Sequence, residues 1–278
     1  MTNFTRREEG ELVYYAADGL ESTGLVRHGF STRHGGVSRD ALASLNLGFK
    51  NDEVSSVLEN RRRFLTALGL DPARLVTGQQ VHGTVVAEVT ARDVGRGALR
   101  WEDGFPATDA LVTSLSGVPI AVATADCVPI LYLDPVKKAI GAAHAGWRGS
   151  VRGIAQAVVT KLRECYGSNP EDILAAIGPS IGPCCYEVDE RVMIPLQDNF
   201  PFWRRVVEPR GDGHWFLNLW ELNRQVLVAA GVLERNIAVG ELCTSCQVLD
   251  FFSYRAEKGF TGSLAAVIAL KEDNKKQL

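Results

Sequence analysis

Histidine and methionine are scarce in this chain of 278 residues, which contains five histidines and two methionines, one of them Met1. A four-copper oxidase needs roughly ten histidine ligands, a cysteine and usually an axial methionine. The composition therefore excludes a multicopper oxidase of that architecture. A single site built from one cysteine and two histidines is still compatible with it.

Long apolar runs and an excess of positive charge are also missing. The longest apolar candidate, residues 118–133, is interrupted by Asp126 and is shorter than the ~18 residues that a membrane span needs. The charged N-terminus is not followed by an apolar segment, so we expect no signal peptide. The net charge of −3 argues against a protein that mainly grips nucleic acid or an anionic membrane. We therefore expect a cytoplasmic protein with no nucleic-acid or membrane partner.

The six cysteines do not predict a disulfide framework, because the chain is large and shows no export signal. Cys243 and Cys246 form a C-x-x-C pair, but no second pair follows at the spacing of a zinc ribbon. Cys184 and Cys185 are adjacent, which disposes them poorly to bind one ion together. We therefore expect no structural zinc site at either pair.

Length and composition, with 46% apolar and 23% charged residues, predict a single large domain spanning residues 1–278. One helix is expected to begin near Asp52, with Val54 on its apolar face. A second is expected to follow Ser150, and a third to follow Asn218 and end at Gly231. Because strand-like runs cluster between these helices, the pattern predicts an α+β layered sandwich of mixed β-sheets flanked by helices. The strand-like runs are 25–31, 110–113, 119–124, 129–133, 139–143, 173–177, 237–242 and 264–270.

A β-hairpin is predicted where Asp134 and Pro135 separate two apolar runs. If the turn occupies residues 134–137, Cys127 lies directly opposite His144, with Cβ atoms about 5 Å apart. A slip of one residue would separate them. A thiol and an imidazole at this distance suit either metal binding or a thiolate nucleophile with its base.

A third candidate ligand, His82, lies in another strand-turn segment. Together with Cys127 and His144 it would make an open three-ligand zinc site. The intervals between these residues match no local zinc motif, so the spacing alone favours a buried cysteine and two unrelated core or surface histidines.

Residues 146–150 lead into the second predicted helix. Unpaired N–H groups at a helix start, with Arg148 and Arg152 beside them, would make an anion or phosphate site. Alternatively, Ser150 is only the N-cap of that helix and the arginines are surface residues.

Several segments together resemble the bacterial YlmD/YfiH family, which was long described as multicopper polyphenol oxidase or laccase-domain protein and later as purine nucleoside phosphorylase. The resemblance runs from about residue 25 to 270. Ser263 stands where the family pattern leads us to expect a basic residue. The segments that carry the resemblance are RHGFSTRHGGVS at 27–38, SLNLG at 44–48, QVHG at 80–83, TADC at 124–127, AHAGWRG at 143–149, AIGPSI at 176–181, FSYR at 252–255 and TG at 261–262.

The resemblance implies a layered α+β fold and one metal site formed by His82, Cys127 and His144. It also implies phosphorolysis of adenosine, inosine, guanosine and methylthioadenosine, and deamination of adenosine. Asn46 and Gln80 become candidate pocket residues on this ground alone, as does Arg255.

The ligand set then permits a mechanism. Zinc would provide an activated water for attack on C6 of adenine, with Asp126 as the candidate proton shuttle. Arg148 would position the phosphate that displaces the base at C1′. The expected partners are therefore small nucleosides and phosphate.

Three alternatives remain open at this point. Cys127 as nucleophile with His144 as base would make an amide hydrolase editing cell-wall precursors. Copper(II) outcompetes zinc at such ligands, so a single-copper polyphenol oxidase activity is the second. A metal- or nucleotide-binding module without catalysis is the third.

Overall fold

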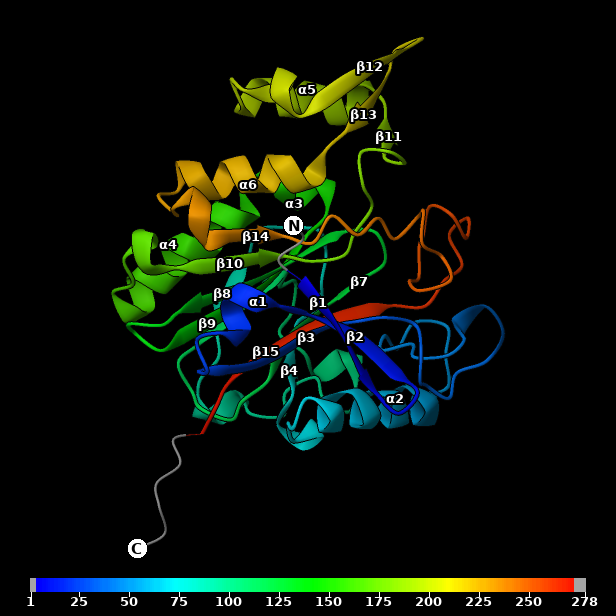
Figure 1. Ribbon diagram of the computed structural model, residues 1–278, viewed down its shortest axis with the longest axis vertical. Helices are drawn as coiled ribbons and strands as arrows, with labels where there is room; N and C mark the ends of the chain where they lie inside the picture. Colours follow the sequence, from blue (N-terminus) through cyan, green and yellow to red (C-terminus); the bar gives the residue numbers. More distant parts are fainter. Residues whose placement is uncertain (1–3, 273–278) are drawn as a thin grey trace, which may run out of the picture.

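Two six-stranded β-sheets pack face to face in the computed structural model, which describes residues 4–272 (Figure 1). The first sheet has the order β1 (Phe4–Glu9), β2 (Leu12–Ala17), β3 (Val26–Ser31), β15 (Leu264–Leu270), β7 (Ile120–Thr124), β4 (Val76–Thr77). The second has the order β14 (Ile237–Val239), β10 (Leu174–Ile177), β8 (Val128–Asp134), β9 (Ala139–Ala145), β6 (Ala110–Thr113), β5 (Val86–Glu88). Parallel pairs occur beside antiparallel ones in both sheets, so the predicted mixed sheets are confirmed.

The central strand β8 is buried along its whole length. Its side chains alternate between two cores, because successive residues of a strand point to opposite faces. Ile130 and Tyr132 belong to the core under the helices. Leu131 and Leu133 belong to the core between the two sheets. Burial on both faces explains why this segment reads as a nearly continuous apolar run.

Helices cover the outer faces of both sheets. On the second sheet lie α4 (Ile154–Tyr166) and α6 (Leu219–Ala229), whose apolar stripes join the β8 core. On the first sheet lies α2 (Val54–Ala67), which packs Phe64 and Leu65 against that sheet. The layers are thus helix, sheet, sheet and helix, which confirms the predicted layered sandwich.

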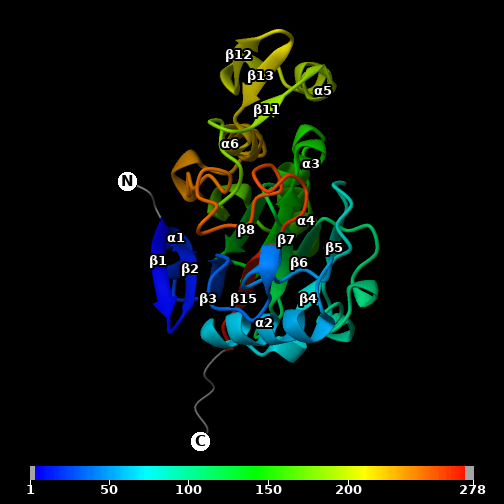
Figure 2. The ribbon, with the colours of Figure 1, turned by 90° about the vertical axis from the view of Figure 1, so that its right-hand side faces the viewer.

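A small three-stranded sheet forms a cap at the end of the molecule opposite α2 (Figure 2). Its order is β11 (Glu187–Val188), β13 (His214–Leu217), β12 (Val207–Gly211), and α5 (Glu190–Asn199) lies with it. The remaining short helices are α1 (Asp18–Glu21) and α3 (Trp147–Val151). The sequence analysis did not predict the cap strands, which are short and mostly not buried.

Two of the three predicted helices need correction. In the first helix, Val54 was expected on the buried face, but its side chain is 53% exposed. The buried residues of α2 include the polar Asn60. The second is two helices, α3 and α4, separated by Gly153 with a φ of 80°. Ser150 consequently lies inside α3 and is not an N-cap. The third is confirmed: the side chain of Asn218 caps α6 by accepting a hydrogen bond from the N–H of Glu221.

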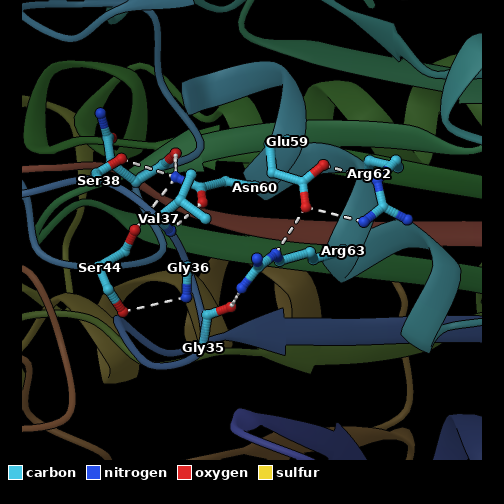
Figure 3. Close-up of polar contacts among 10 residues, drawn as sticks. Gly35, Gly36, Val37, Ser38, Ser44, Glu59, Asn60, Arg62 and Arg63 are labelled. Atoms are coloured by element: carbon cyan, nitrogen blue, oxygen red, sulfur yellow. Dashed lines mark hydrogen bonds and ion pairs between the residues drawn. The ribbon is translucent and has the colours of Figure 1, made fainter. Parts of the chain in front are cut away.

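The buried Asn60 connects α2 to the loop that precedes it (Figure 3). Its side chain accepts from the N–H of Val37 at 2.8 Å and donates to Ser38 Oγ and to the carbonyl of Asn46, each at 2.8 Å. It also donates to the carbonyl of Ser44 at 3.2 Å. An amide with four partners is not an unsatisfied polar group, which is why it is stable in the core. Within residues 4–272, no helix has the length and apolarity needed to cross a membrane.

Candidate active site

The chain crosses from the first sheet to the second twice at the same end of the sandwich. One crossing, residues 125–127, joins β7 to β8 and carries Cys127. The other, residues 78–85, joins β4 to β5 and carries His82. His144 lies near the end of β9, and the ligand atoms of the three residues lie within 4.8 Å of one another. The rings of His82 and His144 meet edge to face, with centroids 4.8 Å apart.

The predicted hairpin register is wrong, although the predicted proximity is right. Asp134 pairs with Ala139, so the turn is 135–138, and His144 lies opposite Pro129. The turn moves because the Asp134 side chain accepts hydrogen bonds from the N–H groups of Val136 and Lys137, at 2.8 and 2.9 Å. Because side chains alternate with a period of two, Cys127 and Pro129 share a face. The thiol therefore still reaches His144, as a diagonal neighbour.

Gly146 is required at this point. A Cβ there would lie 2.7 Å from Cδ2 of His82 and 3.0 Å from Sγ of Cys127. The first contact is closer than real Cβ atoms essentially ever show, and the second is tighter than most of them show. The glycine thus leaves the space in which the imidazole and the thiol approach each other.

Asp109, which the sequence analysis missed, holds two of the three candidate ligands. It is fully buried, and its Oδ1 lies 2.8 Å from Nδ1 of His144. The same carboxylate accepts hydrogen bonds from three consecutive N–H groups, those of Val81, His82 and Gly83, at 3.2, 2.8 and 2.7 Å. Because Nδ1 of His144 contacts Asp109, the other ring nitrogen, Nε2, is available to Cys127. A carboxylate behind a ligating histidine fixes its tautomer and ring orientation.

The charges at the site are coupled. Burial alone would raise the pKa of Cys127, but the neighbouring His144 and His82 outweigh it and lower the pKa to about 6. Burial likewise works against the charged form of His144, but the Cys127 thiolate and Asp109 raise its pKa to about 9. The thiolate is therefore favoured at neutral pH, and the thiolate is the form that binds metals and attacks electrophiles.

A cleft of about 710 Å³ opens over the three residues, a size typical of small-molecule sites. Aromatic side chains form much of its wall: Phe49, Trp101, Trp147, Tyr186 and Tyr254. Four cations and one carboxylate also line it: Lys50, Arg61, Arg148, Arg255 and Asp126. The balance of charge favours an anionic ligand.

The cations differ in how far they are engaged. Arg61 is half-buried and donates to the carbonyls of Leu47, Gly97 and Ala98 at 2.9–3.1 Å. Arg148 is exposed and stacks over Trp147, with its Cζ 4.4 Å from the ring centroid. Within the described part of the chain, no carboxylate lies within ion-pair distance of Arg148. Arg148 is thus available to accept an anion from solvent, as is the exposed Lys50.

Arg255 is held by the wall of the cleft. It donates to the carbonyls of Cys185 and Glu187 at 3.3 and 3.1 Å, and its Cζ lies 5.3 Å from the centroid of Tyr186. Its own N–H donates to Oδ2 of Asp126 at 2.7 Å. Oδ1 of Asp126 accepts from Oγ1 of Thr244 at 2.6 Å. Both oxygens of the predicted proton shuttle are therefore already bonded.

The two predicted amide residues bind the backbone. Gln80 lines the cleft, but its side chain exchanges two 2.7 Å hydrogen bonds with the backbone of Ala123. Asn46 is fully buried and donates to Asp52, while its oxygen accepts from the N–H of Ser263 at 2.8 Å. Ser263 lines the cleft beside it. In this structure both amides support the cleft through the backbone.

The remaining three histidines each have a partner elsewhere. Nε2 of His28 accepts from the N–H of Ala17 at 2.9 Å. Nε2 of His34 lies 2.9 Å from Asp250, and Nδ1 of His214 lies 2.9 Å from the carbonyl of Asp212. These three histidines therefore lie outside the His82–Cys127–His144 group.

The premise that no second cysteine pair accompanies Cys243 and Cys246 is wrong. Cys184 and Cys185 are not isolated from Cys243 and Cys246, because the four Sγ atoms lie within 4.8 Å of one another. The sequence pattern could not show this, since the two pairs are on separate loops and meet only in the fold.

Comparison with known proteins gives consistent matches. Residues 27–271 match the family model described as "Multi-copper polyphenol oxidoreductase laccase". The purine nucleoside phosphorylase YlmD of Geobacillus stearothermophilus is 42% identical over 251 residues, which cover 88% of this chain and 90% of that protein. The adenosine deaminase RL5, from an unknown prokaryotic organism, is 38% identical over 229 residues, covering 81% and 87% respectively.

A solved structure supports the same relationship. The crystal structure of YlmD from Geobacillus stearothermophilus superimposes with a TM-score of 0.91 at 38% identity, covering 98% of this chain and all of that one. The sequence and fold matches together show that the chain belongs to the laccase-domain family of YlmD and YfiH proteins.

Proposed function

We propose that the chain is a zinc-dependent purine nucleoside phosphorylase that acts on adenosine, inosine, guanosine and methylthioadenosine and also deaminates adenosine. The observation that carries the proposal is the His82–Cys127–His144 set at the base of a cleft with aromatic walls and cationic side chains. The names of the relatives, purine nucleoside phosphorylase and adenosine deaminase, supply the substrate class.

The three residues fit a catalytic zinc ion. Two imidazoles and a thiolate are donors that zinc prefers, and their atoms are close enough for one ion. Catalytic zinc sites have three protein ligands and an open fourth position, and all three residues here line the cleft. When bound, zinc would supply an activated water with a pKa lowered toward ~7.

The other residues would position the reactants. Aromatic side chains such as Trp147 and Tyr186 offer flat faces for a purine base. Arg148 is free to bind the phosphate that displaces the base at C1′, through a transition state with cationic sugar character. Burial raises the pKa of Tyr186, so its phenol stays neutral and can donate a hydrogen bond.

Three predicted residues take positioning roles in this proposal. Asp126 holds Thr244 and the backbone of Arg255, and so fixes the loop that carries Arg255. Gln80 and Asn46 hold the cleft wall through the backbone bonds described above. Asp109 positions His144 and His82 together.

The test is chromatography of adenosine incubated with zinc-loaded protein, with and without phosphate, alongside a Cys127→Ala control. We expect adenine that depends on phosphate, inosine that does not, and neither product with the control. Intact adenosine under every condition would refute the proposal.

One observation favours a second candidate. Asp109, His144 and Cys127 form the acid–imidazole–thiolate series of a cysteine hydrolase, with His144 Nδ1 bound to Asp109. Such an enzyme would cleave amides, for instance in cell-wall precursors, and would not require a metal. Chelation separates the candidates, because the zinc enzyme would lose its activity and the hydrolase would keep it.

A single-copper polyphenol oxidase activity is the third possibility, and the family description gives it a name. Copper(II) binds such nitrogen and sulfur donors more tightly than zinc does. We attribute any oxidase activity to copper loading, because the chain lacks the histidines for a multicopper centre. Metal analysis of protein isolated from cells grown without added copper would test this assignment.

A further inference from the structure

A second cluster of metal-type ligands lies beside the cleft and is not explained by the proposed function. We propose that Cys184, Cys185, Cys243 and Cys246 form a closed tetrathiolate site for one zinc ion. The site would tie together two loops, residues 178–186 and 240–250, the first of which contributes Ile181 and Tyr186 to the cleft wall.

The distances fit one ion. Sγ of Cys246 lies 3.4 Å from that of Cys184 and 3.3 Å from that of Cys185, and all four Sγ atoms lie within 4.8 Å of one another. Zn–S bonds of about 2.3 Å in a tetrahedron place sulfur atoms about 3.8 Å apart. The thiols are all free, and their separations are well beyond a disulfide bond. An iron–sulfur cluster would hold its thiolates farther apart, since several irons separate them.

A tight turn brings the two adjacent cysteines to one place. The N–H groups of Cys185 and Tyr186 both donate to the carbonyl of Gly182 at 3.0 Å, and the N–H of Glu187 donates to the carbonyl of Cys185 at 3.1 Å. This folding of the backbone is why adjacent residues can both face the C-x-x-C pair. Gly182 has no room for a side chain, because a Cβ would lie 2.7 Å from the Trp220 ring.

The C-x-x-C pair is held as a compact ligand loop. The N–H of Gly182 donates to Sγ of Cys243 at 3.2 Å, which stabilises a thiolate there. The N–H of Gln247 donates to the carbonyl of Cys243, and the N–H of Thr244 donates to the carbonyl of Ser180, both at 3.1 Å. Cys243 is buried while Cys184 and Cys246 are exposed, so the site has an anchored base and an open path for the ion.

The position of the four-cysteine site indicates what a bound ion would do for the neighbouring cleft. One loop carries Tyr186 and the carbonyl of Cys185 that binds Arg255. The other carries Thr244, which binds Asp126. An ion bound by both loops would therefore fix the wall of the cleft on which Tyr186 and Arg255 lie. Structural zinc contributes to folding stability in the same way in other proteins.

The test is the metal content of protein purified without added metal, under anaerobic and reducing conditions. We expect about two zinc ions per chain in the unaltered protein and about one in each of two variants, Cys127→Ala and Cys246→Ser. The double variant should have none. The matched control is Cys165→Ser, which removes a partly exposed thiol on α4 and should keep both ions. Equal zinc in Cys246→Ser and the unaltered protein would overturn the proposal.

Cobalt gives a second readout that does not depend on how the Cys246 variant folds. Cobalt(II) bound to the Cys127→Ala variant should show the strong thiolate charge-transfer bands of a sulfur-only tetrahedral site. Their absence would overturn the proposal, as would a Cys184–Cys246 or Cys185–Cys246 disulfide in freshly isolated protein. These readouts are independent of the proposed enzyme activity, because the Cys127→Ala variant is expected to be inactive whether or not it keeps the second ion.

Discussion

The two clusters of candidate metal ligands differ in donor set, burial and origin. The first combines two imidazoles with one thiol, has His82 and Cys127 on the crossings between the two large sheets and His144 on β9, and faces a cleft. The second has four thiols on two surface loops, and two of the four cysteines are exposed. Three ligands leave a coordination position for substrate chemistry, whereas four fill a tetrahedron. The comparison separates a site suited to catalysis from one suited to holding loops in place.

Their supports also differ. In the first cluster a buried carboxylate, Asp109, bonds to one ligand and to the loop of another. In the second the support comes from the backbone, where the N–H of Gly182 donates to Cys243. A charged support tunes the basicity of a ligand, and a backbone support mainly fixes its place. Substitutions in the two clusters and around them should therefore change activity, metal affinity and stability by different amounts.

The largest difference is expected between Cys127→Ala and Cys246→Ser. Loss of Cys127 should reduce kcat/KM for adenosine phosphorolysis by more than the roughly 100-fold that loss of an outer-shell partner costs. Loss of Cys246 should lower the melting temperature and reduce kcat/KM by less than about tenfold. Steady-state kinetics and thermal unfolding of both variants measure this. Equal loss of activity in the two variants would remove the distinction between the clusters.

The next effect concerns the support of the first cluster. Asp109→Asn should weaken zinc binding by roughly 10- to 100-fold, because His144 loses the carboxylate that orients it. Competition with a chromophoric chelator measures the affinity. Asp198→Asn on α5 is the matched control, since Asp198 is exposed and lies outside the cleft. An unchanged affinity in Asp109→Asn would show that Asp109 is only a structural residue.

A smaller effect on activity is expected for Arg148, an exposed cation that lines the cleft. Arg148→Met should raise the KM for phosphate by about tenfold or more and change the KM for nucleoside less, because a charge-assisted hydrogen bond is worth about 1.5–3 kcal/mol. Arg152→Met is the control, because Arg152 is also exposed but does not line the cleft. Equal changes in both KM values would refute a phosphate role for Arg148.

The smallest effect on activity, with a clear effect on stability, is expected at a histidine outside both clusters. Burial lowers the pKa of His28 from 6.5 to about 4, and its neutral ring accepts a hydrogen bond from Ala17. Because the pKa is lowered in the folded protein, the unfolded chain binds a proton at a higher pH than the folded chain does. The contribution of the neutral His28 ring to the free energy of unfolding is therefore full above pH 6.5 and is lost as the pH falls toward 4. This contribution of His28 to the free energy of unfolding totals roughly 3 kcal/mol.

Urea unfolding at several pH values, on metal-free protein, tests this. The free-energy gap between the unaltered protein and His28→Gln should narrow as the pH falls through this range, whereas His214→Gln, at an exposed position, should leave the pH dependence unchanged. A constant gap would show that His28 does not titrate in this way.

Local patterns predicted much of the fold. Residues 110–113 and 264–270 were predicted as strands and are β6 and β15 with the same bounds. The helix between Asn218 and Gly231 was also predicted, because a side-chain cap and a glycine stop are local signals. The hairpin was placed correctly but its register was not, since Asp134 could occupy either the turn or the ladder, and only its bonds to Val136 and Lys137 decide.

Patterns in the sequence predicted the layered α+β architecture, which the structure confirms. With the help of a family resemblance they also proposed His82, Cys127 and His144 as candidate metal ligands, and the structure brings these three side chains together. The support of His82 and His144 by Asp109, and the meeting of Cys184 and Cys185 with Cys243 and Cys246, are visible only in the folded chain. The physical reason is separation along the chain. Periodicity and caps act over a few residues, whereas a support or a ligand contributed from a distant loop depends on how whole sheets and loops pack.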